Sequence, residues 1–257
     1  MAAMDGNPDL ALGNALGSNI VNTGLILGVT ALIAPIMVQS NIVRKELPLL
    51  LLIGLLFGYF IWDKSLTRVE AVLLLVGFFS LIGWSIFSAM RGKNDALESD
   101  MEQELVSHSM SKAKAIFWLV VGLVLLIVSS RVLVWGAVNI AHEFGVSDLV
   151  IGLTIVALGT SLPELAASII AVRKGEHDIA IGNVVGSNMF NLLAVIGIAG
   201  VISPMQNLSA DVLSRDWLVM MVMTVVLLMM AYGLRRPGRI NRYEGAGLLL
   251  AFAAYNV

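Results

Sequence analysis

The sequence predicts an all-α polytopic membrane protein with about eight transmembrane helices. Of its 257 residues, 58% are hydrophobic and only 13% are charged, whereas soluble domains are about 45–50% apolar and about 25% charged. Long apolar runs alternate with short charged segments, as in chains that cross a bilayer repeatedly. The net charge of −2 gives no indication of a nucleic-acid partner, and the absence of cysteine excludes a Cys-based metal or redox site.

Charges and turn residues divide the chain into eight expected spans. Several have roughly the 20 residues that a helix needs to cross a bilayer, and the last one looks incomplete. The spans lie near Leu10–Met37, Leu47–Trp62, Val69–Met90, Ala115–His142, Leu149–Val172, Ile179–Ile202, Leu218–Leu234 and Tyr243–Val257.

Basic residues gather in every second loop. Twelve Lys and Arg fall in one set of alternate loops, and three fall in the other set, namely Lys64, Arg68 and Arg215. Cytoplasmic loops are enriched in Lys and Arg, so we expect both termini to lie outside. The loops expected in the cytoplasm are 38–46, 91–114, 173–178 and 235–242.

An internal repeat defines the architecture. Residues Asp9–Pro35 align without gaps to Asp178–Pro204, and eleven of the 27 positions are identical. Both copies contain the pattern G-N-x-x-G-S-N-x-x-N, which starts at Gly13 and at Gly182. Polar side chains are costly in a bilayer, so their identical spacing indicates a true repeat. The loop assignment gives the copies opposite directions, as in secondary transporters that bind substrate at a repeat interface.

The repeat divides the chain into two halves. Residues 1–90 form the first half, 91–114 a cytoplasmic linker, and 115–257 the second half, with a complete repeat unit at about 149–204. A span containing Gly159–Glu164 precedes the second copy, but only eight residues precede the first. We therefore expect that a helix is missing at the N-terminus and that the chain is a fragment of a longer protein.

Glu164 is the strongest candidate for an ion ligand. It lies near the middle of an apolar span, where an ionised carboxylate costs about 3 kcal/mol on insertion scales. Pro163 frees a backbone carbonyl of the preceding turn, and the hydroxyls of Thr160 and Ser161 lie nearby on the helix. Such all-oxygen surroundings suit Ca²⁺ and Na⁺. The alternative is a kinked helix whose Glu is protonated or paired with Arg131.

The two polar helices of the repeat offer further oxygens. Ser18 and Asn22 are one turn apart in the first copy, as are Ser187 and Asn191 in the second. Each pair presents a hydroxyl and an amide carbonyl. The alternative is helix packing through Gly-x-x-x-Gly motifs and interhelical hydrogen bonds. The inverted repetition beside a Glu-bearing helix favours an ion site.

The motifs at Gly159–Glu164 and Gly182–Asn191 resemble those of the calcium/cation antiporter superfamily, the sodium/calcium exchangers, and especially bacterial inner-membrane calcium/sodium antiporters. Members have ten helices in two inverted halves, each with a G-T-S-x-P-E helix followed by a G-N-x-x-G-S-N-x-x-[DN] helix. The resemblance covers the chain as helices three to ten, so the first two helices would be lacking. It implies an integral protein of a bacterial inner membrane.

The resemblance also implies roles for individual residues. Glu164 would be the carboxylate ligand shared by Ca²⁺ and Na⁺. Many members carry Asp where this chain has Asn191, a departure that lowers the negative charge of the site and bears on its preference for Ca²⁺ over Na⁺. The remaining ligands would come from Thr160, Ser161, the carbonyl of Ala157, Ser187, Asn191, Ser18 and Asn22.

The predicted function is Ca²⁺/Na⁺ antiport by alternating access in the intact parent protein, with no cofactor and no enzymatic activity. A Ca²⁺ site needs about six to eight oxygens, so this fragment, with one carboxylate, is not expected to transport ions alone. A proton/cation exchanger, which the neutral Asn191 permits, and a non-transporting membrane scaffold are the alternatives. An intramembrane protease would need a mid-span His or paired Asp, which the sequence lacks.

Overall fold

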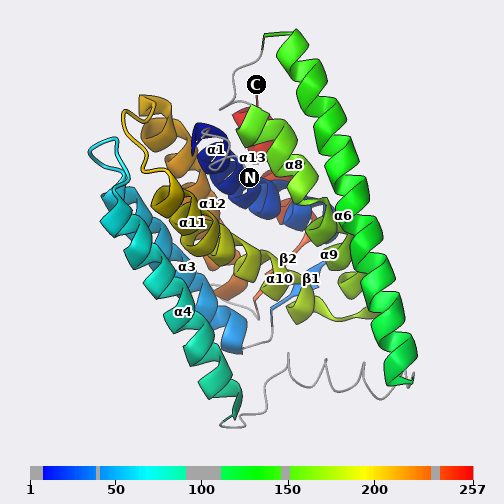
Figure 1. Ribbon diagram of the computed structural model, residues 1–257. Coiled ribbons are helices and arrows are strands. Elements are labelled where there is room, and N and C mark those ends of the chain that lie inside the picture. Colours follow the sequence, from blue (N-terminus) through cyan, green and yellow to red (C-terminus); the bar gives the residue numbers. More distant parts are fainter. Residues whose placement is uncertain (1–7, 39–40, 91–110, 146–150, 233–237, 257) are drawn as a thin grey trace.

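The computed structural model describes residues 8–38, 41–90, 111–145, 151–232 and 238–256, and nearly all of them are helical (Figure 1). Most of the expected linker lies outside these residues. The first half comprises α1 (Pro8–Val21), the π-helical turn η1 (Asn22–Ile26), α2 (Leu27–Ile33), β1 (Ile36–Met37), α3 (Asn41–Phe60) and α4 (Arg68–Met90). The second half comprises α6 (Lys112–Glu143), η2 (Gly152–Val156), α8 (Ala157–Thr160), α9 (Leu162–Lys174), α10 (His177–Phe190), η3 (Asn191–Val195), α11 (Ile196–Ile202), η4 (Val212–Trp217), α12 (Leu218–Tyr232), β2 (Arg239–Ile240) and α13 (Arg242–Tyr255).

Within the described ranges, four helices are long and apolar enough to cross a membrane. A fifth candidate is the broken helix Thr154–Thr160 plus Leu162–Lys174, which is bent by 44°. The all-helical membrane fold expected from the sequence is confirmed, whereas the count of eight spans stays a prediction. The four continuous spans are Leu10–Ile33, Arg68–Phe87, His177–Ile202 and Val212–Tyr232.

Several expected spans differ in length from the helices observed. The first was expected to reach Met37, but its helix ends at Ile33, because Pro35 follows and Ile36–Met37 pairs as a strand. Charged residues occupy the start of α3, and α13 has only 14 residues. Neither helix therefore offers a long uncharged stretch.

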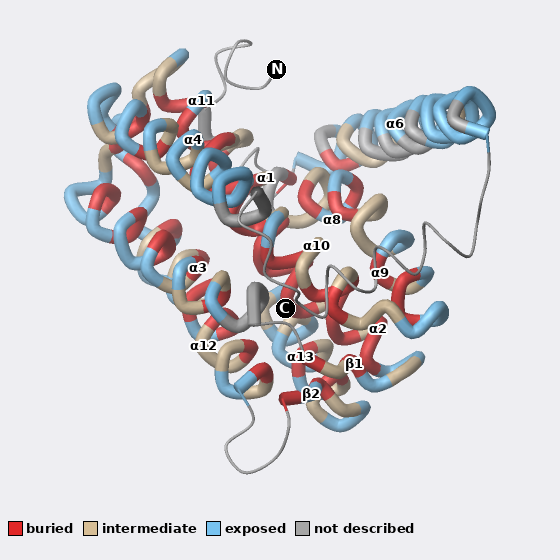
Figure 2. The backbone as a smooth tube through the Cα atoms, turned by 90° about the horizontal axis from the view of Figure 1, so that it is seen from below, coloured by how far each residue is buried: buried red, intermediate tan, exposed pale blue. Residues whose placement is uncertain are grey.

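The outer helices expose apolar side chains. Trp84 on α4 and Trp118 and Trp135 on α6 are all more than half exposed. Figure 2 shows α6 exposed along most of its length, whereas the centre of the bundle around α1 and α10 is buried. Exposed aromatic and aliphatic surfaces of this extent suit contact with lipid.

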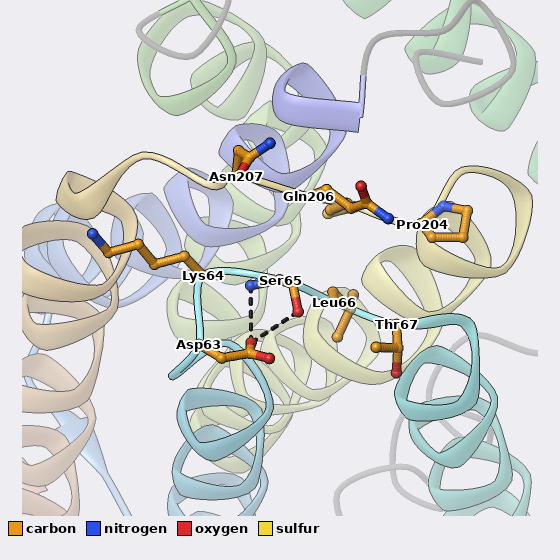
Figure 3. A pocket seen from close by; sticks show the side chains of 9 residues that line it. Asp63, Lys64, Ser65, Leu66, Thr67, Pro204, Gln206 and Asn207 are labelled. Atoms are coloured by element: carbon orange, nitrogen blue, oxygen red, sulfur yellow. Dashed lines mark hydrogen bonds between the residues drawn. The ribbon is translucent and has the colours of Figure 1, made fainter.

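Two short β contacts follow the repeat. Ile36 pairs with Ile240 between β1 and β2, and Met205, the repeat equivalent of Ile36, pairs with Leu66. Figure 3 shows the hollow beside this second contact, where Asp63 accepts two hydrogen bonds from Ser65. β1, which follows α2, thus pairs with β2, which precedes α13. Met205, which follows α11, pairs with Leu66, which precedes α4.

The same symmetry governs helix packing. α13 packs on α2 and η1, as α4 packs on α11 and η3. α2 and α13 approach so closely that a Cβ on Gly28 would lie 3.0 Å from the carbonyl oxygen of Gly245. α4 and α13, the last helices of the two halves, both begin with a reciprocal cap. The cap is formed by Thr67 with Glu70 in α4 and by Asn241 with Glu244 in α13.

A buried carboxylate joins the ends of two helices in the second half. Asp216 on η4 is fully buried, and its Oδ1 accepts hydrogen bonds from Arg215 Nε at 2.7 Å and from the hydroxyl of Tyr255 at 2.9 Å. Its Oδ2 is buried without a partner among the described residues. The cluster therefore fastens the end of α13 to the start of α12.

Replacing Gly245 by Ala is predicted to destabilise the bundle by about 1–3 kcal/mol, because the new methyl group overpacks a close helix crossing. Its Cβ would lie 2.8 Å from Ala31 Cβ and 2.9 Å from the carbonyl oxygen of Gly28. Gly247→Ala on the same helix is the control, because its Cβ would meet nothing within 4 Å. Thermal unfolding in detergent should show a lower midpoint for Gly245→Ala only; equal midpoints would contradict the packing described.

Replacing Tyr255 by Phe is predicted to cost about 1.5–3 kcal/mol, because it removes a hydrogen bond to a buried carboxylate. Tyr243→Phe is the matched control, since Tyr243 lies on the same helix and is 90% exposed. Chemical unfolding of the two variants should separate them. A Tyr255→Phe variant as stable as Tyr243→Phe would show that Asp216 does not fasten α13.

Candidate ion-binding site

A break between α8 and α9 places the residues of the G-T-S-x-P-E motif. α8 ends at Thr160 and α9 starts at Leu162, with Ser161 between them at φ −97° and ψ 0°. Pro163 lies in the first turn of α9, a position that proline favours. Thr160 and Glu164 therefore belong to two helical segments that meet at Ser161, rather than to one continuous helix.

Glu164 lies in the first turn of α9 and points toward α10. The hydroxyl of Ser187 donates to Glu164 Oε1 at 3.1 Å, and Glu164 Oε2 is buried with no hydrogen-bond partner in the described part of the chain. Arg131 is exposed on α6, and no described ion pair joins it to Glu164. One oxygen of a partly buried carboxylate is thus available to a ligand.

Thr160 contacts α1 through a cluster of oxygens. Its Oγ1 lies 3.0 Å from Asn14 Oδ1, 3.2 Å from Ser18 Oγ and 3.2 Å from the carbonyl oxygen of Ala157. Ser161 is buried in the same break. The structure therefore brings Ser18, Thr160 and Ala157 together, as the sequence suggested, and adds Asn14.

The amides of Asn22 and Asn191 each bond to an asparagine of the other repeat copy. Asn22 Nδ2 donates to Asn188 Oδ1, and Asn191 Nδ2 donates to Asn19 Oδ1, both at 3.0 Å. Asn22 is fully buried, and its Oδ1 has no partner among the described residues. A second oxygen in the bundle is thus available to a ligand, here on an uncharged group.

A π-helical turn begins at each of these two amides. η1 starts at Asn22 and η3 at Asn191, which are equivalent positions of the repeat. π-helical turns inside α-helices are frequent at functional sites, because the wider turn alters which side chains face one another. No pattern in the sequence predicted these turns.

Sequence reasoning also missed Asn14, Asn19 and Asn188 as members of the site. Their signal was present, since Asn14 and Asn19 are identical to their repeat equivalents. In the described ranges, no group of three or more His, Asp or Glu could hold a metal ion. The described site residues thus comprise one carboxylate, Glu164, bonded to the hydroxyl of Ser187, together with hydroxyl, amide and carbonyl oxygens on the adjoining helices.

Comparison with known proteins gives consistent matches along the chain. The family model described as sodium/calcium exchanger protein matches residues 1–87 and 114–257. The protein CaxA of Alkalimonas amylolytica is 49% identical, over 99% of this chain and 79% of CaxA. The inner membrane protein YrbG of Escherichia coli (strain K12) is 38% identical, over 97% of this chain and 76% of YrbG.

A solved structure shares the fold. The sodium-calcium exchanger NCX_Mj, soaked with Na⁺ and Ca²⁺, superposes with a TM-score of 0.76 and 28% sequence identity. The match covers 98% of this chain and 77% of NCX_Mj. With the family model matching both halves and the polar motifs gathered at one site, this chain belongs to the sodium/calcium exchanger family of membrane antiporters.

Proposed function

We propose that this chain carries half of the ion site of a Ca²⁺/Na⁺ antiporter. The observation that supports this most directly is Glu164 Oε2, a buried carboxylate oxygen without a partner in the described ranges. A buried charge is costly unless it is paired, and a bound cation would pair it. Asn22 Oδ1, also buried and unpartnered there, would serve as a neutral ligand of the same ion.

Shared ligands would explain exchange rather than co-transport. Na⁺ and Ca²⁺ both prefer oxygen ligands. A site with few charges would hold either Ca²⁺ or Na⁺ at one time. Inverted repeats that meet at the site allow it to open to either side of the membrane in turn. The proposed ligands are Glu164, Ser187, Ser161, Thr160, the carbonyl of Ala157, Ser18, Asn22 and Asn191.

The proposed setting is a bacterial inner membrane with the four basic loops in the cytoplasm. The excess of Lys and Arg in those loops supports this orientation. YrbG, a relative, is named as an inner membrane protein. Both termini would then face outward.

One face of α10 supports the proposal that the site of this chain is incomplete. α1 is covered by η2 and α8, and its Asn14 meets Thr160. The repeat equivalent Asn183 has a buried Nδ2 without a partner among the residues described, and a Cβ on Gly186 would meet nothing within 4 Å. We propose that a second helix of the G-T-S-x-P-E type covers this face and adds the second carboxylate that a Ca²⁺ site needs.

A proton/cation exchanger is the second candidate. The neutral side chain of Asn191 supports it, because a site with one carboxylate has a charge of −1, which suits small monovalent cations. Flux driven by a pH gradient and indifferent to Na⁺ would favour this candidate over Ca²⁺/Na⁺ exchange.

The 257-residue chain alone is predicted not to exchange ions. Liposomes that contain only this chain and hold an outward Na⁺ gradient should take up no more Ca²⁺ than empty liposomes, because the ligand set is incomplete. A calcium ionophore added at the end gives the maximum uptake of the same vesicles. Robust Na⁺-driven uptake before the ionophore would show that the chain needs no further helix.

Glu164→Gln is predicted to weaken Na⁺ binding at least tenfold, equivalent to about 1.4 kcal/mol, because it removes the charge that pairs with the ion. The readout is the Na⁺-dependent rise in thermal stability of the purified chain, which reports binding to the folded state. Glu143→Gln, at an exposed site on α6, is the control and should bind normally. Normal binding by Glu164→Gln would remove Glu164 from the site.

A further inference from the structure

We propose that Asn19 and Asn188 are positioning residues that orient the amides of Asn191 and Asn22, and that the surroundings of Asn19 require a neutral hydrogen-bond donor at position 191. The inference rests on the proposed function, in which the free amide oxygens of Asn22 and Asn191 bind a cation. The hydrogen bonds themselves need no ion and are tested without one.

The two hydrogen bonds are related by the repeat. Asn191 Nδ2 donates to Asn19 Oδ1, and Asn22 Nδ2 donates to Asn188 Oδ1. Asn19 is equivalent to Asn188, and Asn22 is equivalent to Asn191. The four side chains are at most 9% exposed. Each half of the protein therefore orients the proposed ligand of the other half.

These hydrogen bonds fix which end of each ligand amide faces the proposed ion site. An amide has a donating end and an accepting end, and in both ligands the nitrogen is turned toward an asparagine of the other half, to which it donates. The accepting end of Asn22 is the buried Oδ1, which has no partner among the described residues. The same pattern at Asn191 leaves its carbonyl oxygen for the site. The crossed pair thus presents oxygens, rather than N–H groups, to a cation.

Asn19 cannot reverse its own amide. Its Nδ2 donates to the carbonyl oxygen of Asn188 at 3.3 Å and lies 3.4 Å from the thioether sulfur of Met220. Both groups accept hydrogen bonds and cannot donate them. A reversed Asn19 would turn its oxygen toward two acceptors in a buried position, which is unfavourable. Asn19 Oδ1 is therefore held toward position 191.

An ionised carboxylate at position 191 would face this oxygen at hydrogen-bond distance. Two acceptors cannot bond, so Asn19 needs a hydrogen-bond donor at this position, which an amide or a protonated carboxyl group supplies. The backbone of α10 and the sulfur of Met220 thereby select a neutral side chain at this position. The charge of the ion site is set, in part, by a methionine outside it.

The equivalent position in the other half is less restrictive. Asn188 Nδ2 donates to Thr23 Oγ1 at 3.1 Å, and a hydroxyl can either accept or donate. Asn188 can therefore reverse, accept from Thr23 and donate to a carboxylate at position 22. Two positions that the repeat makes equivalent are thus predicted to differ in their tolerance of negative charge.

The test compares Asn191→Asp with its repeat-matched control Asn22→Asp. Infrared spectroscopy of the purified chain in lipid distinguishes a protonated carboxyl group from a carboxylate, and a pH series gives the proton affinity of each introduced carboxyl group. Both variants are made in a Glu164→Gln background, because Glu164 is the charged group of the site.

The other titratable and charged residues near the site are the same in both variants. α10 itself carries His177 and Asp178. Those on the helices packed against α10 and η3 are Asp9, Arg44, Lys45, Glu46, Arg68, Glu70, Arg173 and Lys174.

We expect the carboxyl group introduced at position 191 to bind its proton at least tenfold more tightly than the one introduced at position 22, a difference of about 1.4 kcal/mol. Adding Met220→Gln supplies a side chain that can donate to a reversed Asn19, so it should weaken proton binding at position 191 and leave position 22 unchanged. Met220→Leu, which cannot donate, should change neither. Equal proton affinities at positions 191 and 22, or equal effects of Gln and Leu at position 220, would overturn the proposal.

A second measurement covers the case in which Asn191→Asp does not fold. Hydrogen exchange of the side-chain amides is followed by NMR in the otherwise unmodified chain. Asn19→Ala should accelerate exchange at Asn191 and not at Asn22, and Asn188→Ala should do the reverse. Uniform acceleration, or none, would show that the crossed hydrogen bonds do not orient these amides.

Discussion

The cost of leaving polar atoms unpaired inside an apolar bundle governs this structure. Water is scarce there, so each amide, hydroxyl and carboxylate must find a partner in the protein or in a ligand. Most of the polar side chains on α1 and α10 do so across the helix interface, as Asn19 does with Asn191. Among the residues described, six buried side-chain atoms are exceptions. Two of them, Glu164 Oε2 and Asn22 Oδ1, are oxygens of the proposed site.

The inverted repeat is the means by which one set of motifs satisfies both halves. Four polar positions occur in both repeat copies, and the hydrogen bonds between the copies let each complete the other. They are Asn14, Ser18, Asn19 and Asn22 in the first copy and Asn183, Ser187, Asn188 and Asn191 in the second. The pattern extends beyond the polar helices to the paired β contacts at Ile36 and Met205 and to the caps of α4 and α13. Where the halves differ, as at Thr23 and Met220, the difference falls on the partners of the Asn side chains.

The fold class and the clustering of several site residues could be predicted from the sequence, because polar residues stand out in apolar runs and repeat at fixed spacing. The break at Ser161 could not, since Pro163 is compatible with either a kink or a new helix start. The roles of Asn19 and Met220 could not either, because the direction of an amide depends on which atoms the neighbouring helices bring to it. The number of spans also stayed open, because α3 begins with charged residues and α13 has only 14 residues.

The π-helical turns have a geometric consequence for the helices that follow them. Each turn accommodates about one residue more than an α-helical turn, and one residue corresponds to about 100° of rotation. Compared with an uninterrupted α-helix, α2 and α11 are therefore rotated about the helix axis, with Gly28 facing Leu249 of α13 and Gly197 facing Leu75 of α4. Deleting one residue from either π-helical turn would therefore rotate these glycines away from their neighbours by about 100°.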